Sequence, residues 1–341
     1  MIKLLQKSVL TGFATVAVAG MIASAPNDAH SKSIKLETYA GPKHSMNTDA
    51  WPTWAKWVSE ESKGKLSVKI TYPPINPRDL LDRVRKGIAD VAWITHGYTT
   101  GRFVFTDMVE LPGMAGNAEQ MSRSYWRVYN KHLLSFNEHK DVVLLGLFTH
   151  GPGMLHTSRP IDSIKSFSGL KVRSGGGIQA AIAKRLGIVT VSAPATKAHE
   201  LLSRGVADGI FFSIETIQAF RLGGAVNHHY ALPGNLYGAS FAVIMNKRTF
   251  NGLSKDDQAA VLRASGERMS SMFGSVWDKS DKSAVKGLGA KGNVIANFNS
   301  KLTGEIRNRL KGLDGEWIAR AQKAGLKNAA AVLKELRAGV K

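Results

Sequence analysis

Alternating apolar and polar positions in the N-terminal part of the chain predict short strands separated by helices. Residues 34–40 and 65–72 alternate like strands with one buried face, and residues 90–95 are apolar enough for a strand buried on both faces. Helical spacing of apolar residues predicts helices over 49–62 and 78–86. This alternation of strands and helices predicts a parallel sheet with helices on both faces.

A second set of short strands and helices follows farther along the chain. We expect strands at 153–157, 170–173, 189–191 and 209–212, with helices at about 178–186 and 197–204 between them. Residues 85–90 and 203–208 have the same pattern. In both, a glycine that can end a helix in the left-handed conformation precedes an aspartate that opens a buried strand. The repetition indicates two related lobes.

Two apolar segments are expected to cross between the lobes, so that one lobe interrupts the other. They are the strand at 142–148 and the segment 230–235, which leads into a strand at 239–246. The expected boundaries are 30–148 and 232–270 for lobe I, 149–231 and 271–330 for lobe II, and 331–341 for a C-terminal helix or tail.

The last part of the chain has mostly helical spacing. Ser254 is followed by acidic residues, which is typical of a helix start. The apolar spacing after it predicts one helix of about 30 residues, long enough to brace both lobes. Residues 294–298 predict an edge strand, and amphipathic helices packed on the outside are expected after it.

The N-terminus has the pattern of a bacterial export signal over residues 1–25. Lys3 and Lys7 precede an apolar run at 10–23, and small residues then offer cleavage after Ala25 or Ala29. The run is shorter than the ~20 residues that a membrane-spanning helix needs. We therefore expect a soluble mature protein in the periplasm.

Charge and cysteine content narrow the function further. The chain has 341 residues and a net charge of +20, and it contains no cysteine. Disulfides, thiolate metal sites and cysteine nucleophiles are therefore excluded. The basic residues are spread out, and no zinc-finger or RNA-binding motif is present, so we expect no nucleic-acid partner. The positive field favours an anionic ligand.

Arg173 is the strongest candidate for a ligand contact. It ends the predicted strand at 170–173 and precedes Ser174-Gly175-Gly176-Gly177. In an open α/β sheet, ligands bind beyond the carboxyl ends of the strands. A guanidinium at this place can hold a carboxylate through two parallel hydrogen bonds. The glycines would let the N–H groups of the following helix start approach the same anion.

Catalytic, metal and cofactor sites find no support in the sequence. Glu110 and Glu215 are potential bases, but no nucleophile accompanies them and no Gly-x-Ser-x-Gly motif is present. The histidine pair at 228–229 lacks metal-ligand spacing. The Gly-x-Gly-x-x-Gly at 287–292 follows a predicted helix and precedes a strand, the reverse of a dinucleotide site. We expect no catalytic residue, no metal and no cofactor. His44 and His96 follow predicted strands, which would place them in the cleft.

Several ordered segments resemble the extracytoplasmic solute receptors of TRAP transporters, the C4-dicarboxylate-binding DctP-type family. The matching segments are 85–90, 101–103 with 110–112, 157–161, 168–173, 201–209 and 253–258. The resemblance covers residues 34–327. It implies an α/β, two-lobed periplasmic-binding-protein-like fold with a ligand cleft between the lobes and a long bracing helix. It also implies cleft closure on the ligand and delivery to the TRAP membrane subunits.

The resemblance assigns the carboxylate salt bridge to Arg173 and adds the loops at 43–46 and 95–98 to the pocket. Many members have an asparagine where this chain has Phe212. We therefore expect an organic acid less polar than succinate, such as an aromatic or branched carboxylate, with Phe212 against its apolar part. Alternatively, Phe212 packs inward and Ser213 replaces it. The expected ligand-binding residues are Arg173, Phe212, His44, Thr95, His96, Tyr98, Ser213 and Glu215.

A monomeric binding protein is the expected form, and two other functions remain open. One is a polyanion-binding exported protein that uses the positive charge, for which steep salt dependence of binding would be diagnostic. The other is a periplasmic enzyme on the same fold, which would need a base and a nucleophile converging in the cleft.

Overall fold

The computed structural model describes residues 31–340, which form one unit. The predicted export signal lies outside the described residues. Within them, no helix is both long enough and apolar enough to cross a membrane.

The first sheet has five strands in the order β2-β1-β3-β10-β4. Its strands are β1 (Lys32–Glu37), β2 (Leu66–Thr71), β3 (Val91–Thr95), β4 (Val142–Phe148) and β10 (Phe241–Asn246). β1 pairs in parallel with β2 and β3, which confirms the parallel pairing predicted from the strand–helix order. β10 is antiparallel to both of its neighbours, β3 and β4.

The second sheet has six strands in the order β11-β9-β5-β8-β6-β7. Its strands are β5 (Met154–Thr157), β6 (Lys171–Ser174), β7 (Val189–Ser192), β8 (Gly209–Phe212), β9 (His228–Ala231) and β11 (Val294–Asn297). β6 pairs in parallel with β7 and β8, so the carboxyl ends of these three strands point in the same direction and lie side by side. β11 forms the sheet edge beside β9, as its sequence predicts.

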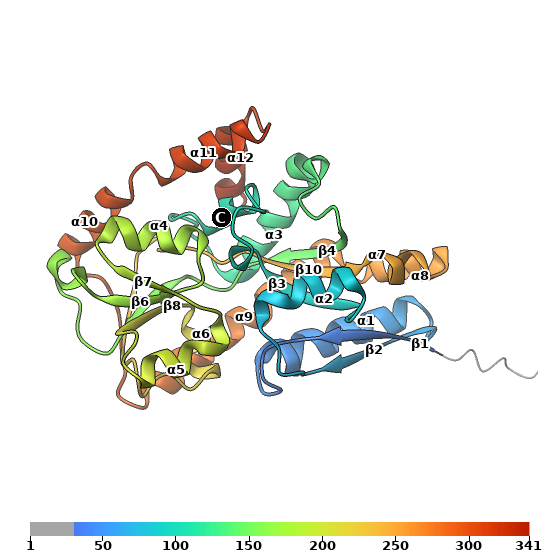
Figure 1. The fold of residues 1–341 in the computed structure, drawn as a ribbon, viewed down its shortest axis with the longest axis horizontal. Helices are drawn as coiled ribbons and strands as arrows, with labels where there is room; N and C mark the ends of the chain where they lie inside the picture. The colour runs from blue at the N-terminus through green and yellow to red at the C-terminus, as the bar shows by residue number, and fades with distance from the viewer. Residues whose placement is uncertain (1–30, 341) are drawn as a thin grey trace, which may run out of the picture. The chain divides into compact units, whose positions relative to one another are not determined.

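Helices cover both sheets and form the C-terminal part of the chain (Figure 1). They are α1 (Trp51–Glu61), α2 (Leu80–Lys86), α3 (Ala118–Val128), α4 (Gly177–Leu186), α5 (Ala198–Ser203), α6 (Ile214–Ala219), α7 (Lys247–Asn251), α8 (Lys255–Arg263), α9 (Gly266–Gly289), α10 (Ser300–Leu310), α11 (Leu313–Lys323) and α12 (Ala329–Ala338). On α1, Trp51 and Trp54 are buried in the core beneath the first sheet.

The long helix predicted after residue 254 is broken into α8 and α9. Ser254 caps α8 as predicted, because its Oγ accepts from the Asp257 amide at 3.1 Å. The chain then breaks at Gly266, which has a φ of +69° that only glycine adopts readily. α9 continues for 24 residues and packs on β4 and α3 on one side and on α6 and β11 on the other. It is therefore in contact with the elements around both sheets (Figure 1).

Two chain segments that connect the sheets lie side by side. The Gly153 amide, just before β5, donates to the Tyr237 carbonyl at 3.0 Å and to Asn235 Oδ1 at 2.9 Å. A Cβ atom at Gly153 would lie 2.5 Å from that carbonyl oxygen, so glycine is required for this approach. The two segments therefore form a backbone-paired connection between the first and second sheets.

The C-terminal helices add a further link between the two sheets. α10 packs on α4 beside the second sheet, and α12 packs on α3 beside the first. Trp317 on α11 is fully buried, and its Nε1 donates to the Val104 carbonyl at 2.9 Å. On α12, the carbonyl of Leu336 accepts from Ser124 Oγ at 2.7 Å. These contacts fix the last three helices against both halves of the described chain.

Candidate ligand-binding site

A cavity of about 480 Å³ lies between the two sheets, against α9. The elements around the first sheet contribute Tyr39, His44, Trp93, Thr95, Tyr98, His150, Ala239 and Phe241 to its wall. The elements around the second sheet contribute Arg173, Gly175, Gln179, Ala195, Phe212, Thr216 and Phe220, and α9 contributes Trp277. The wall therefore draws on both halves of the described chain.

Arg173 lies at the carboxyl end of β6 and is 1% exposed. Its Nε and Nη2 both donate to the carbonyl oxygen of Ala193, at 2.9 and 2.6 Å. Its Nη1 donates to the Phe211 carbonyl at 3.4 Å. Neutral carbonyls thus orient the guanidinium but leave its charge uncompensated. Among the described residues, no carboxylate lies within 4.0 Å of it. A buried charge without a counter-ion is costly, which favours an anion at this place.

Tyr98 completes the polar end of the cavity. It ends the 3₁₀ turn His96–Tyr98 that follows β3. Its hydroxyl oxygen accepts from the Ala195 amide at 2.9 Å and from Arg173 Nη2 at 3.3 Å. Among the described residues nothing accepts the Tyr98 hydroxyl hydrogen. That hydrogen and one Nη1 hydrogen of Arg173 are donors that remain for an anion at this end of the cavity.

The guanidinium edge formed by Nε and Nη2 of Arg173 therefore faces a protein carbonyl. The two parallel hydrogen bonds expected from the sequence need a free edge of this kind. The structure instead offers one arginine donor and one tyrosine donor, which come from opposite sides of the cavity. An anion held by both would link the two sheets.

Aromatic side chains form most of the remaining wall. Phe212 lies under Arg173, with the guanidinium carbon 4.5 Å from the ring centroid, and it stacks on Phe220 at 6.2 Å. On the opposite side, Phe241 stacks on Trp277 at 5.6 Å. Thr95 adds a buried hydroxyl that has no hydrogen-bond partner among the described residues. The cavity thus combines a cationic end with large apolar faces.

The start of α4 faces a protein carboxylate. A Cβ atom at Gly177 would lie 2.9 Å from Glu110 Oε2, so this carboxyl group lies against the helix start. The Gly175 amide donates to Gln179 Oε1 at 2.8 Å. The expectation that these N–H groups approach the ligand anion is therefore not met, because Glu110 and Gln179 lie there. Burial and the nearby Asp107 raise the pKa of Glu110 to about 8.

Residues 36–318 match the family model described as bacterial extracellular solute-binding protein, family 7. The chain belongs to this family.

Solved structures place it among the TRAP receptors of family 7. A TRAP periplasmic solute-binding protein from Bordetella bronchiseptica, with bound (R)- and (S)-mandelate, is 35% identical, with a TM-score of 0.87 and coverage of 91% of this chain and 98% of that one. A TRAP solute-binding protein from Rhodoferax ferrireducens, in complex with copurified benzoate, is 27% identical, with a TM-score of 0.84 and coverage of 91% and 98%. The outer membrane transporter protein TsaT of Comamonas testosteroni is 26% identical over 317 residues, covering 90% of this chain and 92% of the relative.

Several residues proposed for the pocket from the TRAP resemblance lie in the cavity wall, and others do not. Arg173, Phe212, His44, Thr95 and Tyr98 line it. Phe212 lines the cavity, and Ser213, the alternative contact, lies outside its wall. Ser213 Oγ is buried, contacts Thr216 Oγ1 at 3.0 Å and accepts from Trp277 Nε1 at 3.1 Å.

His96 and Glu215 also lie outside the wall of the TRAP receptor's cavity. Both ring nitrogens of His96 are engaged in the core, Nδ1 with Ser240 Oγ at 2.7 Å and Nε2 with His139 Nε2 at 2.9 Å. The residue begins the 3₁₀ turn that follows β3, and these two contacts hold its ring in the core, outside the cavity wall. Glu215 contacts the His44 side chain and does not line the cavity.

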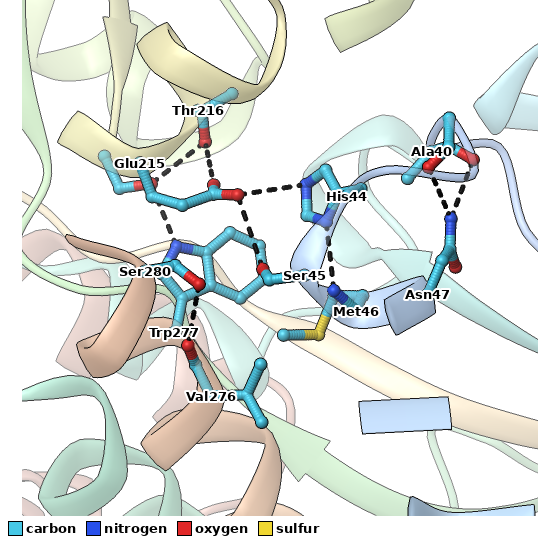
Figure 2. A network of polar contacts seen from close by, with 12 residues as sticks. Ala40, His44, Ser45, Met46, Asn47, Glu215, Thr216, Val276, Trp277 and Ser280 are labelled. Carbon is cyan, nitrogen blue, oxygen red and sulfur yellow. Dashed lines mark hydrogen bonds and ion pairs between the residues drawn. The ribbon is translucent and has the colours of Figure 1, made fainter. Parts of the chain in front are cut away.

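Glu215 joins the two halves of this family-7 protein beside the cavity (Figure 2). Its Oε1 lies 3.5 Å from His44 Nε2 and 3.5 Å from Ser45 Oγ, and Thr216 Oγ1 donates to Oε2 at 3.3 Å. Burial raises the pKa of Glu215 to about 7 and lowers the pKa of His44 to about 4. Between about pH 4 and pH 7 both groups are therefore neutral, and the contact is not an ion pair.

Replacing Glu215 with glutamine should alter how the receptor's stability depends on pH. The pKa of Glu215 is about 7 in the native protein, against 4.5 for the free side chain. The unfolded state therefore binds fewer protons between these values, so stability is lost as pH rises through this window. The ionised Glu215 side chain therefore lowers the free energy of unfolding by about 3 kcal/mol above pH 7. We expect Glu215→Gln to match the wild type at pH 4.5 and to exceed it at pH 8 in denaturant unfolding.

Glu60→Gln is the matched control, because Glu60 is exposed on α1. A stability difference between Glu215→Gln and the wild type that stays constant with pH would contradict the assignment.

Much of the TRAP receptor's wall was missed from the sequence. Trp93 lies in a strand whose positions are nearly all buried, and Trp277 lies on the long helix. Nothing in the sequence around either residue distinguishes a side chain that faces a cavity from one that faces the core. Among residues 31–340, no group of three or more histidine, aspartate or glutamate side chains is arranged to hold a metal ion.

Proposed function

We propose that this protein captures an aromatic monocarboxylate in the periplasm and delivers it to the membrane subunits of a TRAP transporter. The observation that carries the proposal is the buried Arg173, which has no carboxylate partner among the described residues and lies at one end of a cavity walled by aromatic rings. The guanidinium and the Tyr98 hydroxyl would hold the carboxylate. The rings would cover the apolar part of the ligand.

The charge of the wall favours one carboxylate over two. Arg173 is the only lysine or arginine among the lining residues that the structure describes. A second carboxylate would be buried against aromatic faces and neutral groups, which is unfavourable without a second cation. The bound ligands of two solved relatives, mandelate and benzoate, have this composition of one carboxylate and one ring.

Cleft closure accounts for the contacts across the cavity. Tyr98 and His44, from the first-sheet side, contact Ala195, Arg173 and Glu215 of the second-sheet side. Opening by rotation about the segments near 148–151 and 232–235 would break these contacts and expose Arg173 to water. Closure would then present a surface that the membrane subunits can distinguish from the open form. We propose that the protein acts as a monomer and catalyses no reaction.

A thermal-shift screen of the mature protein tests the ligand class. Benzoate, phenylacetate and mandelate should raise the melting temperature, and succinate and malate should leave it unchanged. A ligand at 100 times its dissociation constant adds about 2.7 kcal/mol of stability, which corresponds to a shift of several degrees. Benzyl alcohol is the matched control, since it keeps the ring and lacks the carboxylate.

Preference for a C4-dicarboxylate over all aromatic acids would contradict the proposal. The same assay distinguishes the other functions. Chemical conversion of a bound acid would indicate an enzyme. Retention on heparin that falls steeply with salt, without any response to small acids, would indicate a polyanion-binding protein.

A further inference from the structure

His150 is a polar residue in an otherwise apolar part of the cavity wall. It lies two residues after β4, in the segment that connects the first sheet to the second. Its side chain lines the cavity and is almost fully buried. The rings of Tyr237, Phe241 and Trp277 surround it at centroid distances of 5.7, 5.9 and 6.0 Å. A buried imidazole in such surroundings needs partners for both ring nitrogens.

One ring nitrogen of His150 has a partner that determines its proton. Nδ1 lies 2.5 Å from the carbonyl oxygen of Gly151. A carbonyl oxygen only accepts, so Nδ1 must carry the hydrogen. Burial lowers the pKa of His150 to about 4, so the ring is neutral at physiological pH. The other nitrogen, Nε2, then has a lone pair and no hydrogen.

Nε2 of His150 has no hydrogen-bond donor among the residues that the structure describes. The Trp277 indole N–H donates to Ser213 Oγ at 3.1 Å, and the hydroxyl of Tyr237 makes no hydrogen bond to any described residue, His150 included. The neighbouring faces of Phe241 and Trp277 offer no other hydrogen. An acceptor without a donor in apolar surroundings is unfavourable. A ligand that brings a donor to this place would remove that cost.

We propose that the cavity selects aromatic carboxylates that carry a hydroxyl group, with the ligand O–H donating to His150 Nε2. This inference rests on the proposed function, in which Arg173 holds the carboxylate. Arg173 is on β6 of the second sheet, and His150 follows β4 of the first. The two contacts would therefore come from the two halves that close on the ligand. A hydroxylated acid would add this hydrogen bond to the carboxylate contacts with Arg173 and Tyr98, whereas its parent would engage His150 by apolar contact alone.

Calorimetric titration of matched ligands tests this selection. The panel pairs benzoate and phenylacetate with their 2-, 3- and 4-hydroxy isomers, with the corresponding methoxy compounds, and with mandelate. At least one hydroxy acid should bind the wild type about 3- to 10-fold more tightly than its parent, the gain expected of one hydrogen bond. The methoxy compound has no hydrogen to donate, so it should lose this gain without any change to the protein.

His150→Phe is the protein-side test, because it keeps an aromatic ring and removes the acceptor. The ratio of hydroxy-acid to parent affinity, measured within this variant, should fall to about one, whatever its affinity for the parent. His150→Gln returns an acceptor and should restore part of the preference. Parent binding and melting temperature report whether each variant is folded. Nitrogen NMR of the histidine rings should also show Nδ1 protonated and Nε2 unprotonated.

Three results would overturn the inference: hydroxy acids no tighter than their parents, a methoxy compound that keeps the gain, or a preference that survives in His150→Phe. If the parents bind through Arg173 but the hydroxyl adds nothing, this inference alone fails. If no aromatic acid binds at all, the proposed function fails with it.

Discussion

Arg173→Ala should weaken the binding of benzoate or mandelate by about 2–5 kcal/mol, or roughly 30-fold to 5,000-fold in dissociation constant. The expected loss is large because the guanidinium is 1% exposed and has no carboxylate partner among the described residues. Its removal leaves the ligand carboxylate in a largely apolar cavity without a cation and with only neutral hydroxyl donors such as that of Tyr98. Titration calorimetry on the purified mature protein measures the effect.

Arg159→Ala is the matched control, since Arg159 is exposed beyond the end of β5 and does not line the cavity. Its affinity should equal that of the wild type. Arg173→Lys should recover little, because a lysine cannot reproduce the contacts of the guanidinium with Ala193 and Phe211. An Arg173→Ala variant that folds and binds within threefold of the wild type would refute the role given to this residue.

Trp317→Ala should reduce the free energy of unfolding by about 3–5 kcal/mol, the usual loss for a fully buried tryptophan. Trp317 is 0% exposed on α11, and its indole N–H donates to the Val104 carbonyl. The substitution would remove this large side chain and leave that carbonyl without a partner. Denaturant unfolding followed by circular dichroism measures the change in midpoint.

Trp57→Ala serves as the comparison for that experiment. Trp57 is only half-buried on α1, where the guanidinium of Arg268 covers one face at 3.9 Å. Trp57→Ala should lower the free energy of unfolding clearly less than Trp317→Ala does. Equal losses for the two variants would contradict the greater contribution assigned to the buried Trp317.

The sequence predicted the strands better than the helix ends. The strands at 142–148 and 209–212 match the structure to the residue, because alternation and apolar runs depend on burial, which both sheets impose. The helix after residue 254 was predicted without its break. Gly266 lies at that break because a Cβ there would lie 3.3 Å from the Trp126 ring. A tertiary contact of this kind leaves no periodic signal.

The site was predictable only where a general rule applies. Arg173 follows from the rule that ligands lie beyond the carboxyl ends of parallel strands. Trp93 and Phe241 lie within strands, and His150 lies in a connection. Apolar residues facing a cavity and apolar residues facing a core have the same periodicity. Their role emerges only when the two sheets are placed against each other.

The strand order of the first sheet has a consequence for biosynthesis. β10 lies between β3 and β4 but is made after all the strands β5 to β9 of the second sheet. Until residues 241–246 have been made, β3 and β4 each have an unpaired edge. Such edges promote aggregation. A nascent chain of this protein must therefore stay protected by chaperones, or unfolded, until residue 246 of its 341 residues has been synthesised.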